Sequence, residues 1–123
     1  MKLSKSEEKL MTYLWKLERA FMKDLLECYP EPQPATTTVA TLLKRMQEKG
    51  YVAYEQLGRS RQYYPLVKKQ DYFSKYIKGL ISRFFDNSPS QFASFFTEET
   101  DLSETELVEL QQIINRELQK KKR

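Results

Sequence analysis

The sequence predicts a mainly α-helical protein with one small β-hairpin, built from 123 residues. Apolar residues recur at helical spacing in residues 1–50 and again in residues 71–123, whereas residues 51–67 are rich in β-forming side chains. A chain of this length holds one compact domain and an appendage, but hardly two independent cores. We therefore expect a compact domain over residues 1–70 and a helical segment over residues 71–123.

The first helix is predicted to begin at a capping box, in which the Ser4 hydroxyl can accept a hydrogen bond from the Glu7 amide and the Glu7 side chain can return the bond. Its apolar face consists of Leu10, Met11, Leu14 and Leu17. A second short helix fits residues 22–29 and must end before Pro30.

The third helix follows a proline-rich connector at residues 30–34. The hydroxyls of Thr36–Thr38 are expected to cap it, and Gly50 is expected to end it in a left-handed conformation. Its apolar face consists of Val39, Leu42, Leu43 and Met46.

The hairpin is predicted from two β-rich runs, residues 51–56 and 61–67, with a turn at residues 57–60 between them. Three helices followed by a hairpin make up the element order of a winged helix-turn-helix domain. We expect the hairpin to form the wing.

The remaining residues are helical again and carry more apolar surface than one small domain can bury. Eight large apolar side chains lie on one 14-residue stretch, residues 72–85. A break at residues 87–90, a short helix around Phe95 and a capped last helix from Ser103 follow. The economical arrangement is a symmetric homodimer, and the alternative is that these helices fold back on their own chain. The predicted dimerisation residues are Tyr72, Phe73, Tyr76, Ile77, Leu80, Ile81, Phe84, Phe85, Leu107, Leu110 and Ile114.

Composition argues against an enzyme. The chain has no histidine, which is the usual acid–base group at neutral pH, and a single cysteine, Cys28. Its three glycines are too scattered for a phosphate-binding loop. We therefore expect no catalytic site, no metal and no cofactor.

The expected compartment is the cytoplasm. No apolar run approaches the roughly 20 residues that a transmembrane helix needs, so no membrane insertion is expected. Residues 1–5 lead straight into a charged helical pattern without the apolar core of a signal peptide.

The basic residues gather in the first part of the chain. Residues 1–70 carry 13 Lys and Arg against 8 Asp and Glu, whereas residues 71–123 carry 8 against 9. The face of the third helix opposite its apolar side carries short hydroxyls at its start and two cations one turn further along, with Glu48 near its end, and this layout suits a helix that enters the major groove of DNA. The residues predicted to contact the groove are Thr37, Thr38, Thr41, Lys44 and Arg45. Arg59 and Arg61 flank the hairpin turn and are predicted to contact the flanking DNA backbone.

The sequence also resembles a known family. Residues 37–52 resemble the recognition-helix signature of the penicillinase and methicillin-resistance repressors, the BlaI/MecI group. Residues 6–15 look like the first helix of that family, residues 61–67 like the second strand of its wing, and residues 102–110 like its last helix.

The resemblance implies a homodimeric transcriptional repressor that binds a palindromic operator of double-stranded DNA at antibiotic-resistance or stress genes. It also implies a sensor-linked protease that relieves repression by cleaving an Asn-Phe bond before the last helix. The corresponding pair here is Phe95-Phe96, without the asparagine. The cysteine-rich motif of the copper-responsive relatives is absent, because the chain has only Cys28.

Two other functions fit the same fold. One is a winged-helix module that binds proteins and not DNA. The other is a DNA-binding activator or anti-repressor, which the sequence does not distinguish from a repressor.

Overall fold

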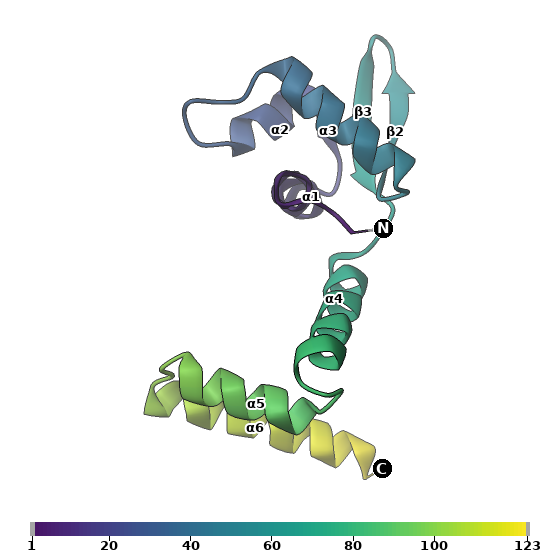
Figure 1. Cartoon of the computed structure of the whole chain (residues 1–123). Coiled ribbons are helices and arrows are strands. Elements are labelled where there is room, and N and C mark those ends of the chain that lie inside the picture. Colours follow the sequence, from purple (N-terminus) through teal and green to yellow (C-terminus); the bar gives the residue numbers. More distant parts are fainter. Residues whose placement is uncertain (1, 123) are drawn as a thin grey trace. The chain divides into compact units, whose positions relative to one another are not determined.

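The computed structural model describes residues 2–122 and divides the chain into two compact units, Met1–Lys75 and Tyr76–Arg123 (Figure 1). Helices and a small antiparallel sheet make up the fold, as the sequence predicts. The elements in chain order are α1 (Lys5–Leu17), β1 (Ala20–Phe21), α2 (Met22–Cys28), α3 (Thr36–Glu48), β2 (Val52–Leu57), β3 (Ser60–Pro65), α4 (Lys69–Phe84), α5 (Pro89–Glu99) and α6 (Glu104–Lys121).

Helix α1 begins at the predicted capping box. The Ser4 amide donates to Glu7 Oε1 at 2.7 Å, and the Glu7 amide donates to Ser4 Oγ at 3.2 Å. The predicted inward residues Leu10, Met11 and Leu14 are fully buried. Leu17 was expected with them but is 37% exposed, because the helix ends at that residue.

The sheet has three strands in the order β1-β3-β2. The hairpin pairs Tyr54 with Tyr63 and Leu57 with Ser60, and Gly58 takes the positive φ of +62° that the tight turn requires. The two-residue strand β1, which the sequence analysis did not include, pairs Ala20 with Tyr63. It ties the chain between α1 and α2 to the wing.

Helix α3 packs through Val39, Leu43 and Met46, which are all buried. The prediction that threonine hydroxyls cap this helix is wrong: Ala35 is the N-cap, and no side chain in the described chain accepts from the amides of the first turn. The helix ends as predicted before Gly50, whose φ is +82°.

An aromatic cluster joins the first turn of α4 to the core of the first unit. The Trp15 and Tyr72 rings lie 5.7 Å apart, and the Tyr51 and Tyr72 rings 5.8 Å apart. Trp15 Nε1 donates to the Val67 carbonyl at 2.8 Å, and the Tyr72 hydroxyl donates to a Glu8 carboxylate oxygen at 2.6 Å. Burial and the neighbouring Glu8 carboxylate raise the pKa of Tyr72 well above its usual range, so its hydroxyl stays protonated as a donor.

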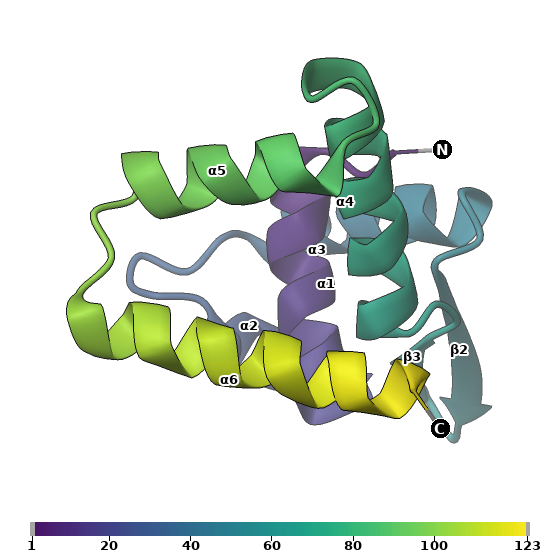
Figure 2. The ribbon, with the colours of Figure 1, turned by 90° about the horizontal axis from the view of Figure 1, so that it is seen from below.

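The second unit contains the rest of α4 together with α5 and α6, and the last two run in opposite directions (Figure 2). Ser88 caps α5, and Ser103 forms the predicted capping box of α6 with Glu106. The Phe85 ring lies 5.6 Å from Phe92 and 5.5 Å from Phe95. Many large apolar side chains of this unit remain exposed. Those more than half exposed are Phe84 at 72%, Ile114 at 63% and Phe95 at 51%.

Helices long and apolar enough to cross a bilayer are missing from residues 2–122.

Candidate nucleic-acid interface

The solvent-facing side of α3 carries all five residues predicted to read the major groove. They are exposed, whereas Val39, Leu43 and Met46 turn to the core, so the predicted division of the helix is present in the fold. The exposed residues of this face are Thr37, Thr38, Thr41, Lys44 and Arg45. The Thr41 hydroxyl donates to the Thr37 carbonyl at 2.9 Å, so it can act toward DNA only as an acceptor and through its methyl group.

The cations on this surface are not neutralised by the protein. Within residues 2–122, Lys44, Arg45 and Arg59 form neither an ion pair nor a side-chain hydrogen bond. The first-turn amides of α3, which lack a side-chain cap, add a partial positive charge at one end of the same face. The surface therefore suits a polyanion.

The wing holds Arg61 in a defined direction. Its guanidinium lies over the Tyr54 ring, 4.4 Å from the centroid, and Tyr54 in turn contacts Tyr63 at 5.8 Å between rings. Arg61 and the buried Tyr63 share one face of β3, because residues two apart on a strand point the same way. The Gln56 amide donates to the carbonyls of Gly58 and Ser60 at 3.1 and 3.3 Å, which braces the turn that carries Arg59.

Two residues of this region were missed by sequence reasoning. The first is Arg19, whose Nη1 donates to Glu55 at 3.0 Å and to Gln62 at 2.9 Å, while its guanidinium lies 4.6 Å from the centre of the Tyr64 ring. Its contacts lie 36 and 43 residues away along the chain, which helical spacing cannot indicate. No sequence pattern identifies it, because the strand β1 that follows it has only two residues.

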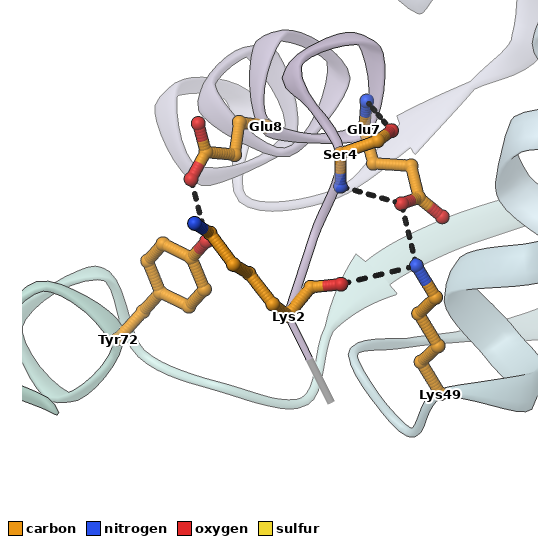
Figure 3. Close-up of polar contacts among 6 residues, drawn as sticks. All are labelled: Lys2, Ser4, Glu7, Glu8, Lys49 and Tyr72. Atoms are coloured by element: carbon orange, nitrogen blue, oxygen red, sulfur yellow. Dashed lines mark hydrogen bonds and ion pairs between the residues drawn. The ribbon is translucent and has the colours of Figure 1, made fainter. Parts of the chain in front are cut away.

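The second is Lys49, the residue that ends α3. Its ammonium donates to the buried Glu7 carboxylate at 2.6 Å and to the Lys2 carbonyl at 3.2 Å (Figure 3). Burial alone would raise the pKa of Glu7, but Lys49 and the Ser4 hydrogen bonds outweigh it and lower that pKa. The carboxylate thus stays charged and fastens the end of α3 to the start of α1.

The residues predicted for dimerisation are placed in both units. Tyr72 is buried against Trp15 and Tyr51 of its own chain, whereas Phe73, Tyr76, Ile77, Phe84, Leu107 and Ile114 are exposed and Leu80, Ile81, Phe85 and Leu110 are half-buried. The dimer interface stays a prediction, as does the assignment of DNA binding to residues 1–70 and of dimerisation to residues 71–123.

The chain is similar to known repressors over nearly its whole length. The model of the family described as penicillinase repressor matches residues 3–116. The methicillin resistance regulatory protein MecI of Staphylococcus aureus (strain N315) is 27% identical over 115 residues, which cover 93% of this chain and 94% of MecI. The penicillinase repressor of Bacillus licheniformis is 25% identical over 121 residues, which cover 98% and 94% of the two chains.

Two solved structures share the fold of this chain. The solution structure of the DNA-binding domain of the repressor BlaI is 25% identical with a TM-score of 0.51, over 58% of this chain and 88% of that chain. A mutant MarR from E. coli is 12% identical with a TM-score of 0.52, over 95% of this chain and 79% of that chain, which shows a shared fold alone. The chain therefore belongs to the penicillinase repressor family, whose members are DNA-binding transcriptional repressors and not enzymes.

Proposed function

We propose that this protein represses transcription as a homodimer that binds a palindromic operator, with α3 in the major groove and the wing on the flanking backbone. The observation that carries the proposal is the exposed, unpaired cationic face of α3 beside a wing that orients Arg61. Short threonine side chains at the start of α3 let the helix backbone approach the DNA, and Lys44 and Arg45 reach base edges or phosphates one turn further along.

A dimer fits this function because it presents two copies of α3 to a two-fold site. Each copy raises the effective concentration of the other at the DNA. The exposed apolar residues of the second unit, with Phe84 and Ile114 the most exposed of the predicted set, supply the surface for a second copy.

The regulated genes we propose are antibiotic-resistance or stress genes, and the protein would act in the cytoplasm. MecI and the Bacillus repressor, which cover nearly the whole chain, carry resistance and penicillinase in their names. A sensor-linked protease is a proposed partner. Phe95 and Phe96, which correspond to the cleaved pair of the family, are both exposed on α5, so cleavage between them requires local opening of that helix.

The function is tested by selecting bound sequences from random duplex DNA with the purified protein at moderate salt. We expect a palindrome whose half-sites lie about 10 base pairs apart, and an affinity that falls steeply as salt rises. Failure to enrich any motif, together with an affinity for duplex that does not change with salt, would instead favour a protein-binding module. A reporter fused to the selected promoter distinguishes repressor from activator.

Replacing Ile114 by Asp is expected to weaken dimerisation by at least tenfold, because a charge buried without a partner in an apolar interface costs well over about 1.4 kcal/mol. Sedimentation velocity at several concentrations measures the monomer–dimer equilibrium. The matched control is Gln119→Asp, which adds the same charge at an exposed polar position of α6. An unchanged equilibrium for Ile114→Asp would place the interface elsewhere.

A further inference from the structure

We infer that Arg19 is a positioning residue for DNA binding: it clamps the wing in the direction in which Arg59 and Arg61 meet the DNA. The inference rests on the proposed contact between the wing and the DNA. It assigns to Arg19 a role through other residues, not a contact of its own with a phosphate.

Arg19 and its contacts with Glu55, Gln62 and Tyr64, which we call the clamp, connect the start of β1 with β2 and β3. Ala20 pairs with Tyr63 on β3, so Arg19, one residue earlier, lies on the opposite face of the sheet from those two side chains. On that face one Nη1 atom donates both to Glu55 of β2 at 3.0 Å and to Gln62 of β3 at 2.9 Å. Glu55 and Gln62 are themselves a directly opposed pair in the hairpin.

A cation–π contact with Tyr64 holds the guanidinium at the same time. Its carbon lies 4.6 Å from the centre of the Tyr64 ring, within the range of a cation–π interaction. The guanidinium spreads its charge over a plane, so its carbon can lie over the ring while a separate nitrogen donates to two acceptors, whereas lysine has one nitrogen for both tasks. The contact is about half exposed, so each part is weak and the combination of ion pair, amide acceptor and ring is what defines the geometry.

The clamp lies at the last pair before the exposed tip of the wing, where the Gln56 bonds to Gly58 and Ser60 stay within the hairpin and do not reach the core. Beyond the Glu55–Gln62 pair only Gln56, Leu57, the turn residues and Arg61 remain, and all of them are exposed. Val52 and Tyr63, nearer the base, are held by the core. Without Arg19, the hairpin twists on its base, and the two cations at its tip lose a fixed position. On the other face of the hairpin, the Tyr54 ring still orients Arg61, but the strands that carry both residues no longer have a fixed position.

The experiment measures the affinity for operator duplex of the full chain with Arg19→Lys, alone and in a variant that already carries Arg59→Ala and Arg61→Ala. We expect Arg19→Lys to weaken binding about fivefold in the native chain, because the single lysine nitrogen cannot keep the ring contact and both hydrogen bonds in the same geometry. We expect no further weakening in the variant without the wing cations. Gln62→Ala, which changes no charge, is expected to resemble Arg19→Lys.

Each alternative predicts a different pattern. If Arg19 contacts a phosphate itself, lysine retains the affinity and Gln62→Ala has no effect. If Arg19 serves only stability, thermal unfolding shifts while the affinity measured well below the midpoint stays native. Equal weakening with and without the wing cations would also overturn the inference. An affinity insensitive to Arg59→Ala with Arg61→Ala would show that the wing does not touch DNA, and both the wing contact and the role of Arg19 would then be wrong.

Discussion

Replacing Lys49 by Met is expected to lower the free energy of unfolding by about 3–5 kcal/mol, because it leaves the buried Glu7 carboxylate without its cation. Glu7 is 1% exposed, its Oε2 atom has no hydrogen-bond partner among the described residues, and without Lys49 only the Ser4 amide remains to stabilise its charge. Urea unfolding of both chains, followed by circular dichroism, measures the difference.

The matched control removes both charges together. Glu7→Gln with Lys49→Met leaves two neutral polar or apolar groups, and a buried pair replaced as a unit costs much less than one partner removed. We therefore expect the double variant to be more stable than Lys49→Met alone. A single variant that loses less than about 1 kcal/mol, the range of an exposed pair, would show that the bond does not hold α3.

At acidic pH, the free energies of unfolding of the native chain and of Lys49→Met should differ less than at neutral pH. In the native chain the folded-state pKa of Glu7 is lowered, so the stability from its charged form is present above the unfolded value of about 4.3 and is lost as pH falls through the folded-state pKa. Removing Lys49 lets burial raise that pKa, so Glu7 of the variant takes up a proton at a higher pH. Because the neutral carboxyl costs less to bury than the unpaired carboxylate, the loss of stability caused by the substitution becomes smaller. Unfolding at pH 7 and at pH 4.5 measures this change.

The fold was predictable where a local rule decides the structure. Ser4 with Glu7 and Ser103 with Glu106 start their helices through bonds three residues apart, and Gly50 takes the positive φ that ends α3. Strand β1 was not predictable in this way, since two residues have no periodicity and Ala20 is a strand residue only because Tyr63 lies beside it. The prediction of a threonine cap failed because the helix begins at Thr36, so the N-cap position falls on Ala35, which has no hydroxyl.

The exposed residues of the candidate DNA-binding site were predictable from the sequence, but the residues that hold them in place were not. The exposed face of α3 follows from helical spacing, because the apolar residues identify the opposite side. The supports of that face join distant segments: Lys49 meets Glu7 across 42 residues, and Arg19 meets Gln62 across 43. The sequence pattern indicates Glu7 only as half of a capping box, although the same carboxylate also forms the buried ion pair. A residue that satisfies one local rule gives no sign of a second, long-range role.

Replacing Lys44 and Arg45 together by Ala is expected to weaken operator binding by about 2–6 kcal/mol, or roughly thirtyfold to twenty-thousandfold, if each side chain contacts a base edge. Both side chains are exposed on the same helix as the threonines and have no protein partner within residues 2–122, so their removal costs little in stability. Fluorescence anisotropy with operator duplex, at several salt concentrations, separates the loss of specific contacts from the loss of charge.

The control for this double variant removes two positive charges from a surface of the protein away from the exposed face of α3. Lys5→Ala with Lys16→Ala does so, because both lysines are exposed on α1, which packs on the side of α3 opposite the threonines. We expect this control to weaken binding only slightly and equally for operator and random duplex, since distant charges act through a screened field. The Lys44 and Arg45 variant should instead lose much more affinity for the operator than for random duplex. If the two double variants weaken binding alike, α3 attracts DNA through charge without reading it, and base recognition must come from another part of the chain.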